Sequence, residues 1–163
     1  MNTIVVYSSK TGYTEAYAKK IGEELSCTIK SLKEITPQQL SAYDRVIYGG
    51  WIMAGKISGY DKIAAMNPKN PVIFAVGMTK PSKELTEKIK ADNNLGSLPF
   101  FYFPGGYRPK KLNFLYKGML GMIRKSIEKK PEKTEDDLYA LEVYGGADKT
   151  DFEAVKALTD SLK

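Results

Sequence analysis

Short apolar runs alternate with amphipathic segments along the whole chain. Runs rich in β-branched and aromatic residues predict strands at residues 3–8, 27–32, 45–48, 71–76 and 99–103. Apolar residues three or four positions apart predict helices at residues 12–25, 59–66, 81–91, 112–127 and 151–162, and a short helical turn at 37–40. This alternation predicts an α/β fold with a doubly wound, five-stranded parallel sheet of order 2-1-3-4-5. Helices would cover both faces to form three layers, with residues 1–163 as a single domain.

The predicted topology indicates where a ligand would bind. In doubly wound sheets, ligands lie outside the carboxyl ends of the strands, where the chain direction switches between the first and third strands. Four loops reach this edge, at residues 8–14, 49–59, 77–80 and 104–107. All four are rich in glycine, aromatic or hydroxyl side chains.

The first loop joins a buried strand to the start of a helix. It contains Ser8, Ser9, Lys10, Thr11, Gly12, Tyr13 and Thr14. The unpaired N–H groups and positive dipole end of a helix favour a phosphate there. The loop lacks both the Walker A pattern and the dinucleotide-binding glycine pattern, so a monophosphate fits better. The alternative is a hydroxyl-rich loop that only caps the helix.

The second loop carries the only tryptophan of the chain. Apolar and aromatic side chains at a ligand edge suit one face of a flat heteroaromatic ring. Alternatively, Trp51 folds back on the core, because tryptophan is usually well buried. The candidate residues here are Gly50, Trp51, Ile52, Met53, Ala54 and Gly55.

The residue inventory excludes several kinds of catalysis. The chain has no histidine and a single cysteine, Cys27, which excludes histidine-based nucleophile pairs, cysteine-cluster metal sites and internal disulfides. If the protein is an enzyme, a bound cofactor is expected to carry the chemistry. The chain opens directly into a strand and has no long apolar run, so we expect no signal peptide and a cytoplasmic location.

Positive charge is concentrated in one segment. Residues 107–133 contain nine Lys or Arg against two Glu, a net charge of +7, whereas the whole chain carries +6. One interpretation is an ordinary amphipathic helix that covers the sheet. The others are docking on an anionic membrane, at its inner face, or binding of an acidic substrate or acidic redox partner. Nucleic acid is not expected, because no binding motif is present.

Four segments carry a resemblance to a known family. The first loop resembles the T/S-x-T-G-x-T phosphate loop of flavodoxins. Residues 43–47 (YDRVI), 103–108 (FPGGYR) and 114–125 (FLYKGMLGMIRK) resemble the flavodoxin-domain group that includes menaquinone-dependent protoporphyrinogen dehydrogenase. Together these segments span most of the chain.

The resemblance implies FMN as the cofactor. Its phosphate would be held by residues 8–14, and its ring would lie between the Trp51 loop and two further loops. These loops contribute Gly77, Met78, Thr79, Gly105, Gly106 and Tyr107, with Trp51 and Tyr107 as candidates for stacking on the ring. The second loop lacks the acidic residues usual in carrier flavodoxins, so we expect a less negative second reduction potential.

Two functions follow from the resemblance. The first is an FMN oxidoreductase related to protoporphyrinogen dehydrogenase, with a quinone as redox partner. Against it, the insertion characteristic of that group is missing from residues 80–98, which read as short and helical. The second is a flavodoxin-type electron carrier that docks transiently on a redox partner protein, although such carriers are usually acidic. A third possibility is that the protein binds FMN for signalling, or binds no flavin at all.

Overall fold

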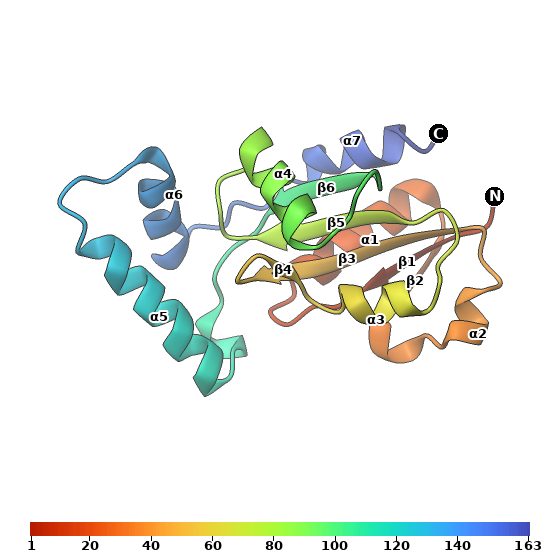
Figure 1. Ribbon diagram of the computed structural model, residues 1–163, viewed down its shortest axis with the longest axis horizontal. Coiled ribbons are helices and arrows are strands. Elements are labelled where there is room, and N and C mark those ends of the chain that lie inside the picture. The colour runs from red at the N-terminus through yellow and green to blue at the C-terminus, as the bar shows by residue number, and fades with distance from the viewer.

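Five parallel strands form the centre of the protein in the computed structural model, which describes residues 1–163. Their order is β2-β1-β3-β5-β6, and a further strand, β4, pairs with β3 only. Counted without β4, this is the predicted order 2-1-3-4-5, so the doubly wound fold is confirmed (Figure 1). The parallel strands are β1 (Thr3–Tyr7), β2 (Thr28–Ser31), β3 (Arg45–Met53), β5 (Val72–Gly77) and β6 (Phe100–Pro104).

Alternation along each strand builds a separate core on each face of the sheet. On β1, Ile4 and Val6 pack into one cluster and Val5 into the other. Tyr48 on β3 lies in the first of these clusters, and Ile47 lies in the second. Neighbouring side chains of a strand point to opposite faces, so a fully apolar strand must be covered on both sides.

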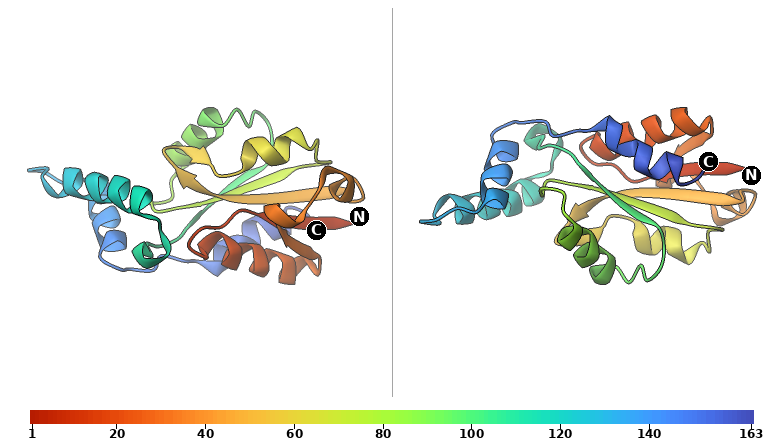
Figure 2. Two further views of the ribbon diagram at one scale, coloured as in Figure 1. Left: turned by 90° about the horizontal axis from the view of Figure 1, so that it is seen from below. Right: turned by 90° about the horizontal axis from the view of Figure 1, so that it is seen from above.

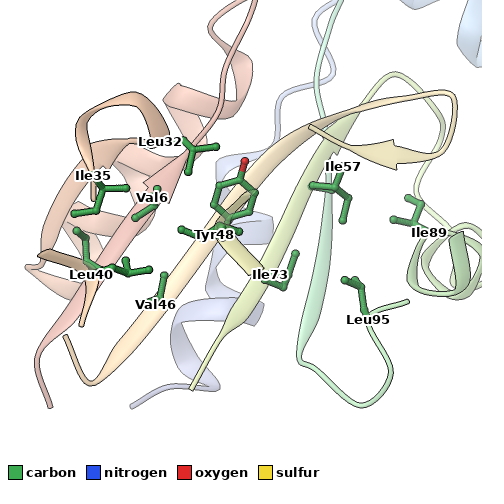
Figure 3. Packing of buried hydrophobic residues seen from close by; sticks show 13 residues of the cluster. Val6, Leu32, Ile35, Leu40, Val46, Tyr48, Ile57, Ile73, Ile89 and Leu95 are labelled. Carbon is green, nitrogen blue, oxygen red and sulfur yellow. The ribbon is translucent and has the colours of Figure 1, made fainter. Parts of the chain in front are cut away.

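Helices cover both faces of the sheet, as the two views of Figure 2 show. The first cluster, drawn in Figure 3, is closed by Leu40, Ile63 and Ile89 from three helices. The second is closed by Tyr17 and Leu158. The covering helices are α2 (Pro37–Leu40), α3 (Tyr60–Ala65) and α4 (Lys83–Asp92) on one face, and α1 (Tyr13–Leu25) and α7 (Val155–Asp160) on the other.

A β-hairpin replaces the predicted second loop. Strand β3 continues to Met53 and turns back through Ala54 and Gly55, which both have positive φ, into β4 (Lys56–Ile57). The prediction that the third strand ends at residue 48 is therefore wrong. Gly49 and Gly50 lie inside the strand, where they admit the Phe74 ring and the Ser58 carbonyl at close range.

Two helices stand apart from the sandwich at the carboxyl edge of the sheet (Figures 1 and 2). Helix α5 (Phe114–Glu128) corresponds to the helix predicted at residues 112–127, whereas α6 (Glu135–Tyr144) was not predicted. Leu120 is the only residue of α5 that is buried, so the interpretation that this helix covers the sheet is wrong. No helix combines the length and apolar character needed to cross a bilayer.

Short 3-10 turns complete the chain. They precede the second helix, the projecting helices and the closing helix. As a result, the closing segment begins as a 3-10 turn before it becomes α7 and is less regular than the helix predicted at residues 151–162. The three turns are Leu32–Glu34, Pro109–Lys111 and Phe152–Ala154.

Candidate functional site

A pocket lies at the carboxyl edge of the sheet, where the predicted ligand loops meet. It holds about 550 Å³ of space between atoms, part of it open to solvent. No Asp or Glu lines it, whereas two cationic side chains do, so its electrostatic character is positive. The lining residues are Lys10, Thr11, Tyr13, Thr14, Trp51, Ile52, Met53, Val76, Gly77, Met78, Gly105, Gly106, Tyr107, Arg108, Leu112 and Leu120.

The first loop presents an uncapped helix end to this pocket. Helix α1 begins after Gly12 with no side-chain hydrogen bond to its first turn. Gly12 has φ of +98°, a conformation that a residue with a Cβ rarely adopts. The hydroxyl-bearing Thr11 and Thr14 line the pocket beside this helix end. The loop therefore offers N–H and O–H donors together with the positive end of the helix dipole.

Two serines of the predicted loop have other partners. The Ser8 hydroxyl lies 3.2 Å from that of Ser58, and the Ser9 hydroxyl accepts a hydrogen bond of 3.1 Å from the Gly12 N–H. Neither serine lines the pocket. They shape the loop together with Gly12, which does not line the pocket either, whereas Lys10, Thr11, Tyr13 and Thr14 do.

Two cations from the segment that follows β6, Arg108 and Lys111, converge on the first loop. Arg108 donates a hydrogen bond of 2.8 Å from Nη1 to the Thr11 carbonyl, and its guanidinium lies 3.9 Å from the centre of the Tyr13 ring. A Cβ placed on Gly12 would lie 2.9 Å from Arg108 Nη1 and 3.9 Å from Lys111 Nζ. The helix end is thus bracketed by positive charge, which favours an anion such as phosphate.

The β3–β4 hairpin supplies an aromatic wall. Trp51, Ile52 and Met53 line the pocket, so Trp51 does not fold back into either core cluster. Tyr116 from α5 packs edge to face against Trp51, with ring centroids 5.6 Å apart. Lys10 Nζ lies 4.2 Å from the centre of the same Tyr116 ring. One side chain of α5 therefore joins the first two loops.

Three predicted members of the second loop lie away from the cavity. Gly50 is inside β3, while Ala54 and Gly55 form the hairpin turn. At Gly55 the nearest side chain is that of Asp92 on α4. These residues hold the hairpin in place and do not line the pocket.

The third loop is anchored through its backbone. Gly77 and Met78 line the pocket, whereas Thr79 does not. The Tyr102 hydroxyl donates a hydrogen bond of 2.7 Å to the Thr79 carbonyl and accepts one of 3.1 Å from the Thr79 N–H. Burial raises the pKa of Tyr102, which keeps the hydroxyl protonated and able to donate.

The fourth loop packs tightly on Tyr13. Gly105, Gly106 and Tyr107 all line the pocket. A Cβ on Gly106 would overlap the Tyr13 hydroxyl, so only glycine allows this approach. The Tyr107 ring meets that of Tyr144 edge to face, with centroids 5.2 Å apart. This contact fixes Tyr107 against α6 and supports the loop from the side away from the sheet.

Four lining residues were not predicted as site residues. Arg108 directly follows Tyr107, and its position within the FPGGYR segment was a signal for it. Val76 is the last residue of the fourth predicted strand, at residues 71–76, and was not predicted as part of a loop. Leu112 and Leu120 reach the pocket because the chain returns over the edge of the sheet, and no local pattern indicates this. No group of three or more His, Cys, Asp or Glu is placed to hold a metal ion.

Comparison with known proteins agrees with this architecture. The model of the flavodoxin-domain family matches residues 4–135. A search of curated proteins finds no match. The flavodiiron core of Synechocystis sp. PCC6803 has a TM-score of 0.50 at 12% identity, and the alignment covers 99% of this chain and 36% of that chain.

Two further solved structures are similar over nearly the full length of both chains. A flavodoxin from the domain Archaea is 16% identical with a TM-score of 0.47, covering 96% of this chain and 99% of that chain. A flavodoxin, WrbA-like protein from Agrobacterium tumefaciens is 18% identical with a TM-score of 0.43, covering 99% of each chain. Because the family model matches more than half of the residues of this chain, the chain belongs to the flavodoxin-domain family.

Proposed function

We propose that the protein binds FMN in the pocket at the carboxyl edge of the sheet and acts as a redox protein. The observation that carries this proposal is the convergence of two features in one cavity. An uncapped, cation-bracketed helix end lies at one part of the pocket, and a wall of apolar and aromatic side chains lies at another. FMN combines a phosphate with a flat ring, and membership of the flavodoxin-domain family supports the same cofactor.

The residues divide into two groups for such a ligand. Thr11 and Thr14 would donate hydroxyl hydrogen bonds to the phosphate beside the first N–H groups of α1, and Arg108 would balance its charge. Trp51, Met78 and Tyr107 would enclose the ring. When bound, FMN supplies transfer of hydride or of single electrons, chemistry that no side chain here provides.

Within this class, we infer an FMN-dependent oxidoreductase related to protoporphyrinogen dehydrogenase. The positive, acid-free lining supports a less negative second reduction potential than that of a carrier flavodoxin, because nearby cations stabilise added negative charge. The basic segment at residues 107–133 suits a carboxylate-bearing substrate. A carrier would instead be expected to present acidic residues around the flavin.

The fluorescence of Trp51 tests the location of the cofactor. Trp51 is the only tryptophan and lines the pocket, so FMN bound there should quench its emission, saturating at one FMN per chain. Riboflavin, which lacks the phosphate, should bind more weakly. Absence of quenching would contradict the proposed site, and equal affinity for both flavins would contradict the role of the first loop.

A second experiment separates the enzyme from the carrier. An FMN-loaded oxidoreductase of this kind should oxidise a porphyrinogen in a reaction that depends on quinone. A carrier should show no such turnover, accept electrons rapidly from a flavodoxin reductase, and titrate in two well-separated one-electron steps. The second pattern, with an extremely low second potential, would contradict the inferred enzyme class.

A further inference from the structure

Helix α5 exposes an apolar face that no part of the protein covers. Phe114, Leu115 and Met122 are 93%, 69% and 73% exposed, and Met119 and Ile123 are exposed as well. Leu115, Met119 and Met122 are spaced three or four residues apart, so they lie on one side of the helix. An apolar face of this length in water is typical of an interaction surface.

A different side of α5 is already engaged with the pocket. Leu120 lines the cavity, and Tyr116 contacts both Trp51 and Lys10. The helix therefore has an inner side that closes the site and an outer side that faces solvent. Figures 1 and 2 show α5 at the end of the molecule farthest from the chain termini, where the sandwich does not obstruct it.

Basic side chains border the exposed apolar face. Lys125 and Lys129 follow Met122 by three and seven residues, which places them next to it on the helix surface and at its end. Both are exposed, and neither forms an ion pair within the chain. Glu128, the only acidic residue of α5, is paired with Arg124 at 2.9 Å. The surface thus combines apolar side chains with unpaired positive charge.

We propose that this outer face of α5 docks on an anionic membrane surface, with the helix lying in the plane of the headgroups. An apolar face bordered by lysines matches the layering of acyl chains and anionic phosphates. A second copy of the chain is disfavoured as the occupant, because a symmetric contact would oppose two segments of net charge +7. Docking in this way would bring the pocket closed by Tyr116 and Leu120 next to the lipid surface.

Vesicle sedimentation of the full-length protein, with and without FMN, tests this surface. Phosphatidylglycerol vesicles should bind it at low salt and release it as salt rises, and phosphatidylcholine vesicles should bind it weakly. Removing two charges in Lys125→Gln/Lys129→Gln should lower partitioning roughly 25-fold, at about fivefold per lysine. Leu115→Ser/Met122→Ser should lower it at least about tenfold.

A matched control removes the same charge elsewhere. Lys33→Gln/Lys62→Gln alters two exposed lysines on the sandwich and should leave partitioning within about twofold of the original protein. Circular dichroism should be unchanged in all three variants, because every substituted side chain is exposed.

Several outcomes would overturn the proposal. These are no binding to phosphatidylglycerol at low salt, equal binding to both lipids, or equal losses in the control and α5 lysine variants. A dimer that forms without vesicles and is abolished by Leu115→Ser/Met122→Ser would assign the face to a second copy instead. Vesicle binding is measured without flavin as well, so failure of the FMN proposal would leave this result unaffected.

Discussion

The α/β sandwich and the projecting pair α5 and α6 use apolar residues in opposite ways. In the sandwich, Ile47 is fully buried between the sheet and its helices. On α5, Ile123 is 46% exposed, and its neighbours Met119 and Met122 are exposed as well. The same residue type therefore stabilises the fold in one region and forms an accessible surface in the other. Apolar content by itself does not distinguish these two roles.

The largest expected difference is between two identical substitutions. Ile47→Ala should lower the free energy of unfolding by about 2–5 kcal/mol, because it leaves a cavity in a closed core. Ile123→Ala should change it by less than about 0.5 kcal/mol, because the side chain already contacts water. Urea unfolding followed by circular dichroism measures both. Comparable losses would mean that α5 packs on the fold as a core helix does.

Removing the cation at the first loop should weaken binding of the cofactor. Arg108→Gln removes the guanidinium that lies beside Gly12 and Thr11, and should lower FMN affinity by roughly tenfold or more. Riboflavin affinity should change little. Arg124→Gln on α5 removes the same charge outside the pocket and should leave FMN affinity unchanged. If both variants lose FMN equally, the effect of Arg108 is only that of overall charge.

Two glycine substitutions, one in the sandwich and one in α5, should change stability in opposite directions. Gly12→Ala should lower the free energy of unfolding by about 1–3 kcal/mol, because φ of +98° strains a residue with a Cβ and Arg108 lies in the way. Gly118→Ala, in the middle of α5 with open space around it, should stabilise that helix by about 1 kcal/mol. Unfolding curves report the first effect and amide hydrogen exchange of α5 the second. The same sign for both would contradict the assigned local conformations.

Alkaline pH should lower the stability of the sandwich only above about pH 10, where buried tyrosines begin to resist deprotonation. Burial raises the pKa of Tyr17 to about 12 from 10.0, and its hydroxyl donates to the Pro104 carbonyl and accepts from the Asp151 N–H. The folded state therefore holds this proton more tightly than the unfolded chain does. The stability that results is fully present below pH 10 and is lost as the pH rises through about 12. Tyr17→Phe should reduce the slope of this part of the stability curve, and Tyr48 and Tyr102, whose pKa values are also raised by burial, should account for the slope that remains. An unchanged slope would contradict the assignment.

The strands and their order could be predicted from the sequence because the apolar runs are short, uninterrupted and separated by helical patterns. The same reasoning located the pocket, because the topology fixes which loops reach the carboxyl edge. The sequence-based prediction ended β3 too early, because Gly49 and Gly50 were interpreted as the end of the strand. Both glycines instead allow close packing by Phe74 and Ser58, a requirement visible only in three dimensions.

The projecting helices show where prediction from local pattern ends. The periodicity of α5 was detected, but periodicity cannot tell which structure, if any, covers the apolar face. Helix α6 has little contrast between its faces, and its clearest sequence signal is the capping box formed by Thr134 and Asp137. The contribution of Leu112 and Leu120 to the pocket depends on how the chain folds back, so it had no local signal.

The absorption spectrum of purified protein after incubation with FMN and desalting tests the central claim most directly. We expect visible flavin bands that remain with the protein at about one FMN per chain, and that are largely lost when riboflavin replaces FMN. Loss of all flavin on desalting, together with no change in Trp51 fluorescence, would contradict an FMN site at the carboxyl edge. The hydroxyl-rich loop would then be a helix end that binds some other anion or none.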